Sequence, residues 1–490
     1  MKIKKINLLR VGQVLLYRSL WLWEHAKRII IFLFWSKKSS PFSARWQTRL
    51  EEMKVLSSTN RGFPIDGQRK LKLRQSFNHG IIFGGTGSGK SSSLIIPWLQ
   101  DIDYSCVVLD VGNELWTKTS CDLRNRGFDL RRIDLSKPMQ SEGINILGLA
   151  KSDDEIQRVA HALLHGAFRD GKGGDPFWEV AGVQLMSNLI KMLKTAPRKY
   201  FNIANVRNLL INLNANPDCP TRLWAMKHIE DKQLYDEFLG CMAGSSTKAT
   251  DSIIMMCKTA LSSISSKELG IMTSKDTFDY ATLRDNKIAL FISIKEVDLE
   301  MRGFLVACIL GRLFSISFDT AKYKNVPPPP LAYILDEAGN LNLSGGATKF
   351  SSILSTLRKH SVTCLQCIQS RSQLVSIYSK SDAESILTTV GTHIIMPGLS
   401  NHQHLSEISQ LLGREMRGDE NRAISAPLMS PHELYTLTGK AVVLLSQHLP
   451  CLVKLKPYYK DKQRLKRSQL PEIECKKRRK RAVELISLTK

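Results

Sequence analysis

The stretch GIIFGGTGSGKSSSLIIPWLQ, residues 80–100, decides the fold class. Its apolar start, Gly80–Phe83, is typical of a short buried strand, and Ser92–Gln100 is typical of a helix. Between them lies GGTGSGKS, Gly84–Ser91, and this strand–loop–helix context distinguishes a P-loop from a chance match. Apolar strands alternate with helices on both sides of it, which indicates a parallel sheet. We therefore predict an α/β fold, a P-loop NTPase domain of the RecA-like kind.

The loop itself predicts a phosphate site for ATP. Glycines let backbone N–H groups turn toward phosphates, and the following helix adds the positive end of its dipole. Lys90 would neutralise the β and γ phosphates, while the hydroxyl of Ser91 would bind Mg²⁺. The alternative is a glycine turn with an exposed lysine. The candidate nucleotide-binding residues are Gly84, Gly85, Thr86, Gly87, Ser88, Gly89, Lys90 and Ser91.

Two further polar groups follow apolar strands. Leu331–Leu335 ends in Asp336 and Glu337, as in a Walker B element, where Asp336 would hold Mg²⁺ through water and Glu337 would polarise the attacking water. Gln369 follows the strand Val362–Ile368 and could sense the γ-phosphate. Acids and amides at strand ends are also often simply solvated, which is the alternative for all three.

The pattern changes to helical periodicity after residue 150, and strand character returns at Ile288–Ile294. An all-α domain inserted into one α/β domain is the simplest account. We expect a basic amphipathic segment in residues 1–40 and a basic tail in residues 458–490. The nucleotide-binding domain would consist of residues 41–150 and 276–457, with the all-α insertion, residues 151–275, between its two parts.

Positive charge gathers at the two ends of the chain. The net charge is +25, of which residues 1–50 and 454–490 carry about +10 each. The run KKRRKR, Lys476–Arg481, could bind nucleic acid or anionic lipid, with a solvated tail as the alternative. The apolar runs of residues 1–40 are interrupted by charges, so we expect no clear transmembrane helix there. Trp21, Trp23 and Trp35 instead suggest a segment lying on an anionic membrane surface or packed on protein.

The ten cysteines have no repeated spacing and no signal peptide opens the chain, which favours a cytoplasmic setting. The one CxxC pair, Cys364 and Cys367, lies on an expected strand. An offset of three residues points the two thiols to opposite faces, so we do not expect them to share a metal.

The order of motifs resembles the type IV coupling proteins of conjugation and type IV secretion, the TraG/TraD family. The resemblance covers roughly residues 40–460. Besides the P-loop, it rests on FSARW (Phe42–Trp46), VVLD with Glu114, GDPFW (Gly174–Trp178), ILDEAGNL (Ile334–Leu341), IQSRSQL (Ile368–Leu374) and LMSPHEL (Leu428–Leu434). The P-loop and the acidic pair are common to many ATPases, so GDPFW, IQSRSQL and SPHEL are the discriminating elements.

The resemblance implies a ring of six subunits with ATP held between neighbours and DNA, single- or double-stranded, in the channel. Arg358 occupies the place of the family's proposed arginine finger, which would act in the adjacent subunit's site. A relaxase or relaxosome and the type IV secretion channel are the implied partners. The implied task is delivery of relaxase-bound single-stranded DNA, or of a protein substrate, to that channel.

Two departures from the family pattern affect the expectation. The family's DPKGE motif is Asp110–Glu114 here, without its lysine, and the two transmembrane helices usual upstream of the motor have no counterpart in residues 1–39. We therefore expect peripheral or partner-mediated attachment to the cytoplasmic face of the bacterial inner membrane. The rival functions are a DNA translocase of the FtsK/HerA type and a substrate receptor or tether whose ATP site is regulatory.

Overall fold

The computed structural model describes residues 43–148, 150, 152–167, 176–242, 246–264, 266–324, 326–344, 348–417, 424–476 and 482–488. The predictions for residues 1–40, for Gly174 and Asp175, and for most of the KKRRKR run lie outside these residues. The chain divides into two compact units. One comprises Met1–Arg45 with Ser406–Pro431, and the other comprises Trp46–Leu405 with His432–Lys490.

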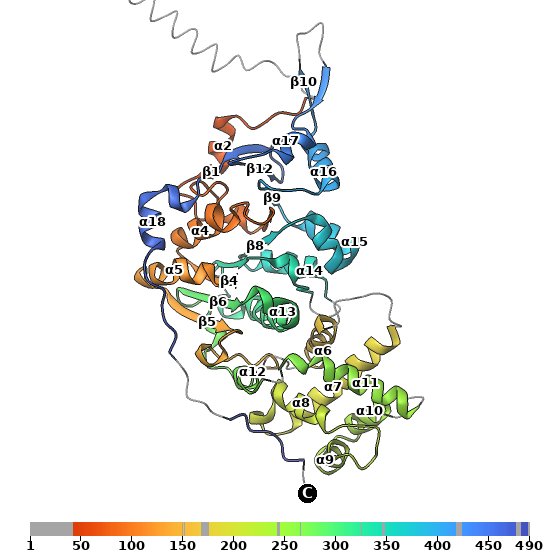
Figure 1. Ribbon diagram of the computed structural model, residues 1–490. Helices are drawn as coiled ribbons and strands as arrows, with labels where there is room; N and C mark the ends of the chain where they lie inside the picture. Colours follow the sequence, from red (N-terminus) through yellow and green to blue (C-terminus); the bar gives the residue numbers. More distant parts are fainter. Residues whose placement is uncertain are drawn as a thin grey trace, which may run out of the picture. The chain divides into compact units, whose positions relative to one another are not determined.

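A nine-stranded sheet is the centre of the larger unit (Figure 1). Its strand order is β13-β12-β9-β3-β8-β7-β4-β6-β5, parallel from β9 to β5 and antiparallel at β12 and β13. Strands β3, β6, β7 and β8 are buried along their whole length, which explains their continuous apolar sequences. The strands are β3 (Gly80–Phe83), β4 (Ser105–Val111), β5 (Asp129–Asp134), β6 (Ile288–Ile294), β7 (Leu331–Leu335), β8 (Val362–Ile368), β9 (Thr392–Ile395), β12 (Lys440–Leu445) and β13 (Cys451–Lys454).

Helices cover both faces of this sheet (Figure 1). One face packs against α4 (Ile96–Asp101), α5 (Glu114–Asn125) and α18 (Lys462–Ser468), with Trp98 and Trp116 in its core. The other face packs against α13 (Glu296–Phe318), α14 (Phe350–Lys359) and α15 (Arg371–Thr389). There the rings of Phe314 and Tyr333 lie 4.7 Å apart. The sheet is thus an inner layer between two helical layers.

All-α structure separates β5 from β6. The predicted fold class, an α/β nucleotide-binding fold with an inserted all-α domain, is confirmed. The helices of the insertion are α6 (Asp153–Ala167), α7 (Pro176–Thr195), α8 (Ile203–Ile211), α9 (Pro220–His228), α10 (Lys232–Met242), α11 (Thr247–Ala260) and α12 (Lys267–Met272).

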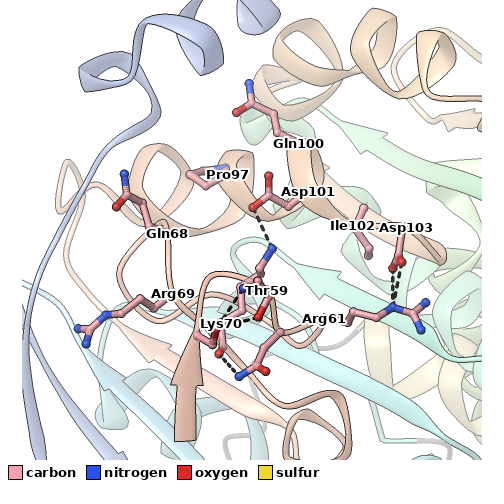
Figure 2. A network of polar contacts seen from close by, with 12 residues as sticks. Thr59, Arg61, Gln68, Arg69, Lys70, Pro97, Gln100, Asp101, Ile102 and Asp103 are labelled. Carbon is pink, nitrogen blue, oxygen red and sulfur yellow. Dashed lines mark hydrogen bonds and ion pairs between the residues drawn. The ribbon is translucent and has the colours of Figure 1, made fainter. Parts of the chain in front are cut away.

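The segment before β3 is tied to the helix that follows the P-loop (Figure 2). It contains α2 (Arg49–Val55), β1 (Leu56–Ser57), β2 (Lys70–Leu71) and α3 (Leu73–Ser76). At the end of α4, Asp101 accepts bonds from Lys70 (3.2 Å) and Arg464 (2.9 Å), and Arg61 pairs with Asp103 (2.9 Å). The end of α4 is therefore fixed from two distant parts of the chain.

Among the described residues of the smaller unit, a hairpin is bonded to Ser43 and Ala44. Strands β10 (Arg414–Arg417) and β11 (Ile424–Pro427) pair antiparallel, and Ala44 donates to the carbonyl of Arg414 at 2.8 Å. Two further helices, α16 (His402–Leu412) and α17 (Pro431–Tyr435), flank this part of the sequence.

One described helix, Glu296–Tyr323, is long and apolar enough to cross a bilayer by length and mean hydropathy. More than half of its apolar window (56 %) is buried inside the fold. Its Phe314 packs on the sheet, so the apolar composition of α13 is accounted for by core packing.

Candidate functional site

Three predicted site segments meet at one edge of the sheet because their strands are neighbours. Strand β8 lies between β3 and β7, with Phe83 opposite Ile368 and Leu335 opposite Gln366. The P-loop, Gln369 and the pair Asp336–Glu337 follow these strands directly. The carboxyl ends of parallel strands share one edge, which is where α/β sheets bind ligands.

The P-loop has a backbone that glycine alone adopts without strain. Gly87 and Gly89 have φ of +74° and +85°, and Gly84 N–H is bonded to the carbonyl of Ile368 at 3.1 Å. A Cβ on Gly84 would lie 2.6 Å from Ser88 Oγ, and one on Gly85 would lie 2.5 Å from the carbonyl oxygen of Gly398. The hydroxyl of Ser88 is buried without a hydrogen-bond partner in the described structure. This tight loop with an unused polar atom fits a phosphate group.

Lys90 is buried beneath the loop. Its ammonium donates to the carbonyls of Gly84 (2.8 Å) and Gly85 (3.2 Å) and lies 4.0 Å from Glu337 Oε1. Thr86 is exposed at the tip of the loop, and Ser91 begins a short π-helical turn, Ser91–Ile95, that leads into α4. The predicted lysine and Walker B acid are therefore brought together.

Asp336 and Glu337 occupy different environments. Asp336 is 8 % exposed, and its pKa is raised to about 7 because it is buried and because Glu337 adds a like charge, while Lys90 acts in the opposite direction. Glu337 adopts a left-handed backbone (φ 57°), which is costly for a non-glycine residue. Its Oε2 accepts a bond from Gln369 Nε2 at 3.4 Å.

Gln373, on the first turn of α15, joins the loops after β7 and β8, and sequence reasoning missed it. Its Oε1 accepts the backbone N–H of Gln369 at 2.9 Å, and its Nε2 donates to Asn340 Oδ1 at 3.0 Å. A Cβ on Gly339 would overlap the Gln373 amide, so a larger residue there would displace that amide. The spacing of two glutamines by four residues in IQSRSQL was the available signal.

Asp110 is a second residue to which sequence reasoning gave no role. It is fully buried at the end of β4, where it accepts the N–H groups of Leu115 (3.1 Å) and Trp116 (2.7 Å) at the start of α5. Burial raises its pKa to about 6, and its charge raises the pKa of Asp336, which directly follows the adjacent strand β7. Asp110 thus couples the α5 N-terminus electrostatically to the Walker B acid.

Arg358 does not join this site. It is exposed at the end of α14, and its charge contributes, after burial, to lowering the pKa of His79. His79 directly precedes β3, and the P-loop directly follows β3. The two are therefore separated by the length of a four-residue strand, about 13 Å. Arg358 therefore lies at the opposite edge of the sheet from its own P-loop.

The two cysteines of the CxxC pair face opposite sides of the sheet, as predicted. Cys367 belongs to the core beneath α4 and α5, whereas Cys364 affects the pKa of Tyr333 and Tyr378 on the other side. Burial raises the pKa of both thiols, which makes them poor nucleophiles and ligands.

Comparison with known proteins gives one family match over nearly the whole chain. The model for type IV secretory system conjugative DNA transfer matches residues 35–482. Among curated proteins, the conjugal transfer protein TraG of Rhizobium radiobacter is 22 % identical over 403 residues, which are 76 % of this chain and 61 % of that protein. Protein VirD4 of Agrobacterium fabrum is 23 % identical over 416 residues, or 78 % and 59 % of the two chains. The chain thus spans about three-fifths of the length of these relatives.

Solved structures show the same fold. The plasmid coupling protein TrwB in complex with the non-hydrolysable ATP analogue ADPNP matches with a TM-score of 0.63 and 17 % identity over 86 % of this chain and 96 % of that one. TrwB in complex with ADP and Mg²⁺ matches with a TM-score of 0.62 and 17 % identity over 85 % and 93 %.

Proposed function

Because this chain belongs to the family of type IV secretory system conjugative DNA transfer proteins, we propose that it is an ATP-driven coupling protein. Its task would be to deliver relaxase-bound single-stranded DNA, or a protein substrate, to a type IV secretion channel during conjugation or mobilisation. The observation that supports an active ATPase best is the meeting of Lys90, Glu337 and Gln369 at one sheet edge.

The proposed chemistry assigns each residue a task. Gly84–Ser91 would bind the phosphates of ATP, Lys90 would neutralise their charge, and Ser91 with Asp336 would hold Mg²⁺. When bound, Mg²⁺ supplies positive charge to the phosphate oxygens. The TrwB structures with ADP and Mg²⁺ and with ADPNP support this choice of ligands.

Glu337 would polarise the attacking water, and its position between Lys90 and Gln369 suits that role. Gln369 donates to the Glu337 carboxylate and would hold it toward the γ-phosphate. The left-handed backbone at Glu337 sets the direction of the side chain.

The proposed assembly is a hexameric ring in which Arg358 reaches the site of the neighbouring subunit. Its distance from its own P-loop supports action in trans rather than in cis. The ring would bind DNA largely without sequence specificity and would contact a relaxase and channel proteins. We place it at the cytoplasmic face of the bacterial inner membrane, held peripherally or by a partner.

Plasmid transfer between cells distinguishes this function from the rival one, a substrate receptor or tether whose ATP site is only regulatory. We expect Glu337→Gln to lower plasmid transfer at least about 100-fold, because hydrolysis drives the movement. Glu300→Gln makes the same change on an exposed carboxylate of α13 and should leave transfer unchanged. Normal transfer with the Glu337 variant would instead favour a receptor whose ATP site is regulatory.

A further inference from the structure

The C-terminal segment Val483–Ile486 lies against α8 of the helical insertion, far in sequence from it (Figure 1). Asn205 Nδ2 donates to the carbonyl of Glu484 at 3.0 Å, and Asn205 Oδ1 accepts the N–H of Ile486 at 2.8 Å. This pair of bonds is the one that an adjacent β-strand residue would make to an extended chain. One side-chain amide therefore recognises peptide backbone.

A residue at the start of the same helix fixes the position of the Asn205 amide. Asn205 is fully buried, and Asn202, which caps α8, accepts its Nδ2 at 3.2 Å. One turn further along, Asn208 Nδ2 donates to the carbonyl of Ile486 at 3.0 Å. Buried amides need their partners, so this row of asparagines favours an extended peptide in this place.

Among the described residues 482–488, Ile486 is the buried residue, whereas Glu484 and Leu485 are both exposed. Ile486 is 7 % exposed, whereas Leu485 is 51 % exposed. Val483 lies beside Gly270 of α12, and its Cγ2 would be in ordinary van der Waals contact, at 4.0 Å, with a Cβ at that position. The exposed pair Lys199–Glu484 (2.6 Å) contributes little to affinity. The recognised pattern is thus an extended chain with an apolar residue at the position of Ile486.

The preceding part of the tail is held separately on α5. Trp116 Nε1 donates to the carbonyl of Ile473 at 3.2 Å, and the N–H of Ile473 is bonded to Ser120 Oγ at 3.1 Å. Release of Val483–Ile486 would leave these contacts intact. The segment therefore has the properties of a tethered ligand, whose local concentration through a short linker is about millimolar.

We propose that α8 and α12 form a binding site for an extended peptide, and that the chain fills this site with its own segment Val483–Ile486. Recognition is through the Asn205 and Asn208 amides and the position of Ile486. The site is distinct from the nucleotide site and independent of the proposed activity.

Binding of a labelled peptide to the full chain tests the site. Ile486→Pro removes the N–H that Asn205 accepts, so the variant should vacate the site without altering it. A fluorescent peptide of residues 482–488 should then bind in trans, at least about tenfold more tightly than to the wild-type chain, whose own segment competes. Adding Asn205→Ala should abolish binding, whereas adding Asn125→Ala, on the exposed face of α5, should not.

Two peptide controls and a second variant complete the test. The peptide with Leu485→Ala should bind as before, and the peptide with Ile486→Pro should not. Ile486→Asp in the chain should also vacate the site, because a charged side chain is unfavourable at this buried position. This variant replaces the proline variant if the latter has a lowered melting temperature. The proposal is wrong if the folded variants with a vacant site do not bind the peptide, or if the proline peptide binds equally well.

Discussion

Gln373 holds two loops of the candidate site through one amide, since it bonds Gln369 on one side and Asn340 on the other. We expect Gln373→Leu to lower kcat for ATP hydrolysis by about tenfold, because two hydrogen bonds of about 1 kcal/mol each are lost and Gln369 is freed. KM for ATP should stay within about twofold, since the P-loop is untouched. Steady-state kinetics measures both.

The control for this prediction is Gln184→Leu, which makes the same change on an exposed position of α7. Gln373→Glu keeps the acceptor for the Gln369 N–H and should recover part of the loss. If Gln373→Leu changed KM and kcat in equal measure, or neither, Gln373 would not position the loop.

Single residues could be predicted from the sequence where a short motif in the neighbouring residues indicates their role. Lys90 and Ser91 follow from the P-loop, and Asp336 and Glu337 from a strand that ends in acids. The spacing in IQSRSQL points to Gln373 but not to its contacts, and no local pattern points to those of Asp110. These contacts depend on β8 lying beside β7 and on β7 lying beside β4. Strand order is a tertiary property that no local pattern determines.

His79 joins three elements of the sheet layer. Its Nδ1 accepts the N–H of Cys364 (3.1 Å) on β8, so its Nε2 carries the proton and donates to the Leu354 carbonyl (2.7 Å) on α14, while β3 begins at the next residue. Burial lowers its pKa from 6.5 to about 4, and the charge of Arg358 acts in the same direction. The folded protein thus requires a neutral ring.

The stability of the protein should therefore fall as the pH falls from about 6.5 to 4. In that range the unfolded chain binds a proton that the folded chain excludes, so up to about 1.4 kcal/mol is lost per pH unit and roughly 3 kcal/mol in all. Above pH 6.5 the contribution is constant. Urea unfolding measures the free energy of unfolding of wild type and of His79→Asn at each pH. Between pH 6.5 and 4 this free energy should fall more steeply with decreasing pH in wild type, by the slope that corresponds to about one bound proton. Parallel slopes would contradict the assignment.

The strands β3, β6, β7 and β8 agree with their predicted apolar runs. Strands β9, β12 and β13, which lie together at one side of the sheet, were not predicted. The four-residue strands β9 and β13 each contain at least one polar residue, whereas β12 is an apolar run that sequence reasoning missed.

Arg358 and the P-loop lie at opposite edges of one subunit, so the proposed site is complete only between subunits. Arg358→Ala and Glu337→Gln should each be nearly inactive alone. A one-to-one mixture should recover about a quarter of wild-type activity, because about a quarter of the interfaces in a head-to-tail ring then pair an intact Glu337 with an intact Arg358.

Two observations must accompany the mixture. Co-assembly is checked by pull-down of differently tagged subunits, and folding of the Arg358 variant by its melting temperature, since Arg358 lies near His79. Full activity of Arg358→Ala alone would remove the arginine from the mechanism.

We propose that Lys90, Asp336 and Glu337 of one subunit serve the same ATP-hydrolysing site, and DNA-stimulated ATPase activity tests this most directly. We predict that Lys90→Ala hydrolyses no ATP, and that Glu337→Gln binds ATP normally but hydrolyses it at least about 100-fold more slowly. Hydrolysis by both variants at the wild-type rate would contradict the site.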